Sequence, residues 1–319
     1  MFAGPCIPTT PTTFFFAYSN DFHYLIVEAA LQEFVSRFSR IKKYVKFANV
    51  RFDIQQQEEI LYHDDISSFN ESVYSHMPDS KLGFGSDNTG SNVLDILEKY
   101  VQNTEAPLCG SLVAIILKRN PTRQDTARLT TLLKNNHIYI RIAESNNMLG
   151  GTDTSIMYNL AVKTNGLYLF SEAEDQFFIS GDVKYLTYAP SENSLIYVGN
   201  PQLSGQGSKK LPVFTIPDSM QNQIQLVFAE INVQNHALSN DVKELVLHIG
   251  NQTSLYGFEV DCDMFQTRNQ TFCLSAGSLT KGQNYKVSVS YNYTSTNMQN
   301  VELRFWIYEP INYWPGFPN

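Results

Sequence analysis

The sequence predicts a two-domain protein in which an α/β domain precedes an all-β domain. The chain has 319 residues, which exceeds the roughly 250–300 residues at which single cores stop growing. Residues 13–185 alternate strand-like and helix-like segments, whereas strand-like runs follow one another from about residue 194. We therefore expect an N-terminal segment at 1–12, an α/β domain at 13–190 and a β-sandwich domain at 191–319.

The α/β prediction rests on the order and character of the segments in the first half. Phe14–Tyr18 is an apolar strand, and the apolar residues after it recur four apart, the spacing of a helix that packs on a sheet. Ser111–Leu117 is a continuous apolar run, typical of a strand buried on both faces. Such alternation predicts a mostly parallel, doubly wound sheet with helices on both faces. Further strands are expected at 44–52, 58–63, 137–143 and 167–170, helices at 22–38, 67–77, 93–101, 129–133 and 154–163, and a loop at 78–92.

The second half lacks helical periodicity. Tyr285–Tyr293 alternates apolar and polar residues, the pattern of a strand with one buried face. Short strands separated by turn residues predict an antiparallel β-sandwich. The Gly- and Ser-rich segment Gln202–Lys210 is interpreted as a linker or a long hairpin loop. The other strands are expected at 195–198, 211–216, 224–231, 244–249, 256–260, 271–274 and 301–308.

Composition excludes several classes of protein. Apolar residues at 43% and aromatic residues at 13%, with only 17% charged residues, argue against disorder. A net charge of −8 argues against a nucleic-acid-binding protein, which would show a basic face. No apolar run reaches the roughly 20 residues that span a bilayer. No signal peptide is visible at the start, so the chain is either cytosolic or a form that lacks its natural leader.

Cysteines and glycosylation motifs bear on the compartment. The even number of cysteines permits a fully paired framework in one of three connectivities, and four free thiols are the alternative. Asn-x-Ser/Thr motifs favour a secreted glycoprotein, although such short motifs also occur by chance. The cysteines are Cys6, Cys109, Cys262 and Cys273, and the motifs begin at Asn70, Asn251, Asn269 and Asn292.

Three local matches, in the right order, make the first half similar to a von Willebrand factor type A domain. The strand and turn Phe14–Asp21 lie where that family has Asp-x-Ser-x-Ser. The loop Gly85–Val93 is similar to the family's Gly-Gly-Thr-x-Thr-Gly-x-Ala-Leu. The strand Leu112–Leu117 resembles the one that ends in Thr-Asp-Gly. The resemblance implies strand order 3-2-1-4-5-6 and a metal-ion-dependent adhesion site at the carboxyl ends of the first and fourth strands.

Transferred residue by residue, that adhesion site is altered. The leading aspartate is Ala17 and the second serine is Asp21, while the first serine is retained as Ser19. The metal-binding threonine is Asp87, and the aspartate of Thr-Asp-Gly falls at Lys118. We therefore expect no metal and no cofactor. Our hypothesis is that Lys118 replaces the cation and pairs with Asp21, Asp87 or both.

The resemblance also bears on the cysteines and on the lineage. Because the first and fourth strands are neighbours in the family, a Cys6–Cys109 disulfide is expected. Cys262 and Cys273 flank an expected hairpin and are candidates for a second disulfide. The whole resembles secreted nematode proteins in which a degenerate A-like domain stands beside C-type lectin or CUB-like modules, and the sandwich is expected to be CUB-like or galactose-binding-like.

These observations predict a non-enzymatic extracellular adhesion protein that binds a protein ligand at the metal-less edge. One alternative is a carbohydrate-binding defence protein of innate immunity that acts through the sandwich, and another is an intracellular scaffold. No nucleophile and base can be paired from the sequence, so a hydrolase has little support. The candidate contact residues are Ser19, Asn20, Asp21, Asp87, Asn88, Thr89, Lys118, Arg119 and Asn120. The oligomeric state is not predicted.

Overall fold

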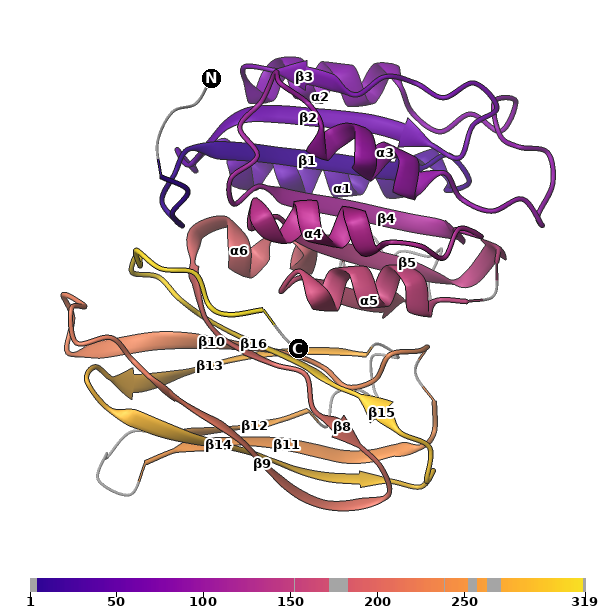
Figure 1. The fold of residues 1–319 in the computed structure, drawn as a ribbon. Helices are drawn as coiled ribbons and strands as arrows, with labels where there is room; N and C mark the ends of the chain where they lie inside the picture. Colours follow the sequence, from indigo (N-terminus) through magenta and orange to yellow (C-terminus); the bar gives the residue numbers. More distant parts are fainter. Residues whose placement is uncertain are drawn as a thin grey trace. The chain divides into compact units, whose positions relative to one another are not determined.

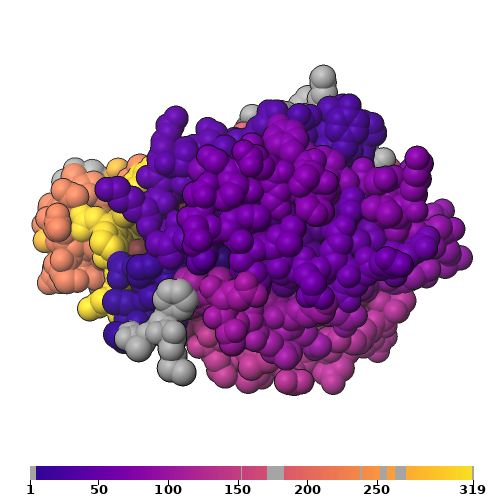
Figure 2. Space-filling view, turned by 90° about the horizontal axis from the view of Figure 1, so that it is seen from above, coloured from indigo at the N-terminus to yellow at the C-terminus, as the bar shows by residue number. Residues whose placement is uncertain are grey.

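A computed structural model describes residues 5–151, 153–171, 183–237, 239–251, 257–262 and 271–317. The chain divides into two compact units, Met1–Ser191 and Glu192–Pro318 (Figure 1). Figure 2 shows the surface of the indigo and purple segments of the first unit from above. The expected α/β half and all-β half thus correspond to separate units.

The first unit contains the expected six-stranded sheet, in the order β3-β2-β1-β4-β5-β6. All neighbouring strands are parallel except β2 and β3. The strands are β1 (Thr12–Ser19), β2 (Tyr44–Phe52), β3 (Leu61–His63), β4 (Leu112–Asn120), β5 (Tyr139–Gly150) and β6 (Leu167–Ser171). This arrangement confirms the α/β fold class and the strand order that the resemblance implies.

Helices cover both faces of this sheet because its strands are apolar on both sides. Phe15 and Ala17 pack in a cluster with α3 (Val93–Val101), α4 (Ala127–Asn135) and α5 (Ser155–Lys163). The alternate residue Phe14 faces the other way and contacts Phe34 of α1 (Tyr24–Phe38) and Phe69 of α2 (Ile66–Ser75). The short helices η2 (Val183–Leu186) and α6 (Tyr188–Glu192), which the sequence did not predict, follow β6. The carboxyl ends of β1, β2 and β4 lie at the right of Figure 1, where the loop before α3 projects.

The second unit is the expected antiparallel sandwich. One sheet has the order β13-β10-β16-β7 and the other β12-β11-β14-β9, with a two-stranded piece of β15 and β8. The strands are β7 (Ser194–Gly199), β8 (Gln202–Leu203), β9 (Gln206–Thr215), β10 (Ile224–Asn232), β11 (Val242–Gly250), β12 (Phe258–Asp261), β13 (Phe272–Thr280), β14 (Asn284–Tyr293), β15 (Gln299–Asn300) and β16 (Glu302–Ile307).

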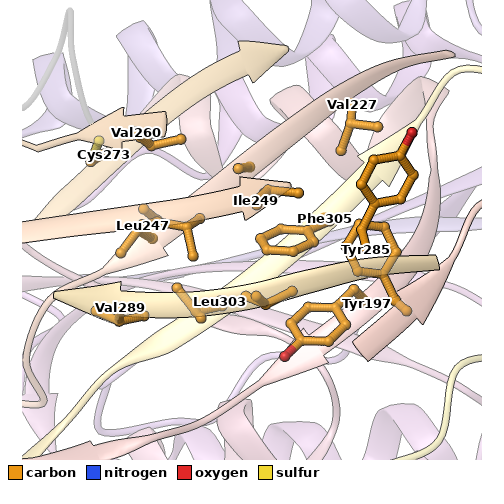
Figure 3. Packing of buried hydrophobic residues seen from close by; sticks show 14 of the residues in the cluster. Tyr197, Val227, Leu247, Ile249, Val260, Cys273, Tyr285, Val289, Leu303 and Phe305 are labelled. Atoms are coloured by element: carbon orange, nitrogen blue, oxygen red, sulfur yellow. The ribbon is translucent and has the colours of Figure 1, made fainter. Parts of the chain in front are cut away.

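Both four-stranded sheets contribute to one core. Phe305 and Tyr197 of the first sheet point into this core with Tyr285 and Val289 of the second (Figure 3), and the Phe305 and Tyr197 ring centroids lie 4.6 Å apart. Phe305 also meets Phe214 of the second sheet, at 5.4 Å between centroids. The interpretation of Gln202–Lys210 as a linker or loop was wrong, because Gln202–Leu203 and Gln206–Lys210 lie in β8 and β9. Residues 206–210 are exposed, so their polar composition fits the outermost strand of a sheet as well as a loop.

Both expected disulfides are present. Cys6 and Cys109 join the segments that lead into β1 and β4, with their Cα atoms 5.5 Å apart. Cys262 and Cys273 join the end of β12 to the start of β13, with a Cα separation of 5.9 Å. The first pairing follows from the adjacency of β1 and β4, as the resemblance implied.

Candidate functional site

The candidate residues gather at the carboxyl ends of β1 and β4 and in the loop before α3. Arg119, at the end of β4, is the centre of this edge, with a side chain only 2% exposed. Its Nε donates to Asp21 Oδ2 at 2.9 Å. Its Nη1 donates to the backbone oxygens of Ser86 and Thr89, at 2.9 and 2.6 Å. One guanidinium therefore joins the β1 turn to the loop before α3.

Two further features surround the Arg119 side chain. The Phe84 ring lies 5.5 Å from the Arg119 Cζ, in cation–π range. Gly150, at the end of β5, has φ +75°, and a Cβ there would lie 2.8 Å from Arg119 Cγ and 2.9 Å from Thr89 O. Only glycine fits so close an approach in this backbone conformation.

The hypothesis that Lys118 is the replacing cation was wrong. The contact shown for Asp21 comes from Arg119, whereas the Lys118 Nζ donates to Ser145 Oγ at 3.2 Å. Lys118 lies between Leu117, which packs in the cluster under α3, and Arg119, and the pairing of β4 with β5 shifts register at this point. Burial lowers the pKa of the Lys118 ammonium, and the negative charge of Asp21 offsets part of this effect because it raises that pKa.

Ser19 belongs to a buried hydrogen-bond network around Asp53, which follows β2. Asp53 Oδ2 accepts from Ser19 Oγ and its Oδ1 from Ser91 Oγ, both at 2.6 Å. The Asn92 side chain accepts from the Asp53 backbone N–H at 2.9 Å. Burial raises the pKa of Asp53 to about 7, because the two hydroxyl donors only partly offset the desolvation of the charge. Asp53 was not predicted from the sequence, since a lone aspartate after a strand carries no motif.

Asn20 positions the neighbouring loop. Its Nδ2 donates to Asp79 O and its Oδ1 accepts from Asp79 N, both at 2.9 Å. The side chain is 3% exposed, so both of its polar groups are engaged inside the protein. Asn20 is therefore a positioning residue for the segment that begins at Asp79.

Asn120 lies at the end of β4 beside a second buried carboxyl group. Its Nδ2 donates to Glu144 Oε1 at 3.4 Å. Burial raises the pKa of Glu144 to about 8. Burial of this carboxyl group therefore favours its neutral form.

The exposed part of the edge is the loop before α3. Asp87, Asn88 and Thr89 are all exposed. The Asp87 backbone oxygen accepts from Gly150 N at 2.6 Å, which fixes the loop to the end of β5. Of the candidate residues, these three present their side chains to solvent, whereas Ser19, Asn20, Lys118, Arg119 and Asn120 are buried.

A cavity of about 500 Å³ adds residues that no sequence motif singled out. It is lined by Ile54, Gln55, Gln56, Gln57, Glu58, Lys81 and Leu82. The Gln55 backbone N–H donates to Leu82 O at 3.0 Å, and its side chain to Gly83 O at 2.8 Å. Ile54 follows Asp53 directly, so the cavity adjoins the buried network. Glu58 forms an ion pair with Arg51. The exposed glutamines of the lining and Leu82, which is 40% exposed, can therefore contact a ligand.

The residues at this edge do not fit the magnesium site that the resemblance implies. Magnesium prefers hard oxygen ligands in open positions. Here Asp21 Oδ2 accepts from a guanidinium, and both Asp53 oxygens accept from hydroxyl groups. Within the described ranges, no three His, Cys, Asp or Glu side chains group as metal ligands. The carboxylates of this edge are thus engaged by donors of the protein itself.

The glycosylation motifs differ in position. Asn70 lies in α2 and Asn292 in β14, and both are half-buried. Asn251 follows β11 and its Nδ2 donates to Gln283 Oε1 at 3.4 Å. Asn269 lies outside the described residues. In the part of the chain that the structure covers, no helix is long and apolar enough to cross a membrane.

Comparisons with known proteins give one family match and several solved structures of similar fold. A family model described as a domain of unknown function (DUF7154) matches residues 199–308, within the second unit. A comparison with curated proteins found no match.

Three solved structures illustrate the likeness of the fold. The human COPII-coat protein Sec24c is 9% identical with a TM-score of 0.42, and the match covers 93% of this chain and 43% of that one. A von Willebrand factor type A protein from Catenulispora acidiphila is 9% identical with a TM-score of 0.42, covering 95% and 66%. The SpRpn10 VWA domain is 11% identical with a TM-score of 0.36, covering 54% and 93%. The chain thus spans less than two thirds of the first two. At these values the likenesses carry no argument about function, and the fold class rests on the observed strand order.

Proposed function

We propose that the chain is an extracellular adhesion protein that binds a protein ligand, without metal, at the carboxyl edge of the first unit's sheet. The observation that carries this proposal is the Arg119 guanidinium, which bonds Asp21 and two loop carbonyls. A fixed internal cation can hold the loop that presents Asp87, Asn88 and Thr89 in one conformation. A preorganised loop loses less conformational entropy when it binds.

Two further observations support binding at this edge. The cavity lined by Gln55–Glu58, Lys81 and Leu82 adjoins the same network and offers amides and an exposed leucine. Clefts with a few polar groups in a partly apolar lining are typical binding sites. The two disulfides support an oxidising, extracellular compartment, because disulfides are rare in the cytosol. No chemical step is needed for this proposed activity.

A binding screen tests the proposal. A multivalent form of the whole chain is applied as the probe to an array of purified extracellular proteins and to a glycan array. A triple alanine variant at Asp87, Asn88 and Thr89 removes the exposed loop groups, and Lys209→Ala with Lys210→Ala, on the exposed strand β9, is the control. We expect binding to a protein that persists in EDTA, is lost in the loop variant and is retained in the control. Binding that requires magnesium, or that survives in the loop variant, would contradict the proposal.

The second candidate is carbohydrate binding through the sandwich. Tyr308 and Tyr313, near its C-terminal end, are 53% and 41% exposed. Aromatic rings of this kind can stack on sugars, as Tyr and Trp combine an apolar face with a polar group. Retention on glycans that is lost in Tyr308→Ala and unaffected by the loop variant would favour this candidate.

A further inference from the structure

The outer face of one sandwich sheet carries a group of side chains that the proposed binding function does not use. In the sheet β12-β11-β14-β9, Leu247 and Val289 point into the core. Because strand side chains alternate, His248 of β11 and Ser290 of β14 point outward. Glu259 of β12 lies opposite His248 in the strand register. Three neighbouring strands thus place a glutamate, a histidine and a serine side by side.

These side chains form a continuous hydrogen-bonded chain. His248 Nδ1 lies 2.8 Å from Glu259 Oε1, and His248 Nε2 lies 3.2 Å from Ser290 Oγ. With its proton on Nδ1, the imidazole donates to Glu259, and its Nε2 accepts from the Ser290 hydroxyl. A carboxylate that orients an imidazole, which in turn accepts from a hydroxyl, is the arrangement that activates serine nucleophiles on unrelated folds.

From this geometry we propose that Ser290 is a nucleophile toward activated acyl and phosphoryl groups, with His248 as its base and Glu259 as a positioning residue. The His248 and Glu259 side chains are 36% and 70% exposed, so substrate and water reach the group without any opening of the fold. The exposed residue Lys210 lies opposite Ser288 in β9 and adds a positive charge to this face. That charge can stabilise a developing oxyanion.

With an ester that has a good leaving group, the proposed reaction is an acyl transfer to Ser290 followed by hydrolysis. Ser290 Oγ bonds to the carbonyl carbon while His248 Nε2 takes the hydroxyl proton. The bond to the leaving alcohol then breaks, and that alcohol leaves with the proton from His248. Solvent water attacks the acyl-serine, and His248 carries the water's proton to Ser290 Oγ as the carboxylic acid leaves. Because the group is hydrated, we expect reactivity only with activated esters and fluorophosphonates.

An alkyl fluorophosphonate probe tests the proposal directly, since it forms a bond to an activated serine with loss of fluoride. The full-length chain is made in a bacterial periplasm, where disulfides form and no N-glycan is attached at Asn292, which shares the face of Ser290. We expect peptide mass spectrometry to find the adduct on Ser290. Labelling should be lost in Ser290→Ala and should fall at least about tenfold in His248→Gln, in line with general-base contributions.

The matched control is Ser288→Ala. Ser288 lies on the same strand and face and is opposite His248 in the register, but the structure describes no hydrogen bond between the two side chains. This variant should be labelled as fast as the wild type. Unchanged circular dichroism and melting temperature show that the variants fold. Absence of labelling at Ser290 in the wild type, or equal labelling in folded His248→Gln, would overturn the proposal.

Discussion

Arg119 Nε donates to Asp21 Oδ2 at 2.9 Å, and so joins the end of the fourth strand to the turn after the first. The side chains are 2% and 15% exposed. Removal of one partner from such a shielded pair leaves an uncompensated charge, which typically costs about 3–5 kcal/mol. The pair is therefore expected to support both the stability of this edge and the conformation of its loop.

The first prediction concerns the guanidinium. We expect Arg119→Ala to lower the free energy of unfolding by about 3 kcal/mol or more, because Asp21 and two loop carbonyls lose their donor. Arg119→Lys should recover only part of this, since an ammonium cannot reproduce the planar fork of donors. Urea unfolding measures both variants. Equal stability of Arg119→Lys and wild type would show that the fork geometry is unimportant.

The second prediction concerns Asp53, whose pKa is raised to about 7 by burial. Between pH 4 and pH 7 the folded state holds a proton that the unfolded state has released, so stability falls as pH rises through this range and is level above it. The upper bound is on the order of 4 kcal/mol, at 1.36 kcal/mol per pKa unit. We expect Asp53→Asn to remove the contribution of this group to the slope in urea unfolding, so that the variant shows a shallower fall than the wild type. Asp87→Asn, at an exposed position, should leave it unchanged.

The third prediction concerns Glu144, whose pKa is raised to about 8 by burial. Its stabilising protonated form is lost as pH rises, so wild-type stability should fall between about pH 4.5 and pH 8 for this group as well. Glu144→Gln mimics the neutral acid and can still accept from Asn120. We expect this variant to match the wild type at pH 5 and to exceed it at pH 9. A variant that is less stable than wild type at pH 9 would contradict the assignment.

The fourth prediction concerns Glu309 in the sandwich. Hydrogen bonds from the Gln225 side chain, and from the backbone and side chain of Asn222 and the backbone of Gln221, lower the pKa of Glu309 to about 2. Its contribution is fully present above about pH 4.5 and is lost as the pH falls toward 2. Glu309→Gln should therefore lower the melting temperature slightly at pH 7 and hardly at all at pH 2, as measured by calorimetry.

The fold class was predictable from the sequence, and the strand order from the family resemblance, whereas the basic residue that bonds Asp21 was not. Apolar runs and helical periodicity report burial, which is why β1, β4 and α3 were predicted within a few residues. The choice between Lys118 and Arg119 depends on which face of β4 each side chain occupies, and a motif alignment that is off by one residue reverses that face. Buried polar networks such as the one at Asp53 join segments that are far apart in the chain. Local sequence patterns therefore do not predict them.

The sandwich shows the same limits. Alternation located the central strands, but the polar and glycine-rich Gln206–Lys210 was assigned to a loop because an exposed strand lacks the apolar signal. The His248, Glu259 and Ser290 group arises from strand register alone, as Glu259 and Ser290 lie 11 and 42 residues from His248. Spacing along the chain could not reveal it.

The most direct test of the central claim, that Arg119 takes the place of a metal at this edge, is titration calorimetry of the purified full-length chain with magnesium and manganese. We predict no binding heat with either ion up to millimolar concentration, in wild type and in Asp21→Asn alike. Micromolar binding in the wild type that is lost in Asp21→Asn would contradict the claim.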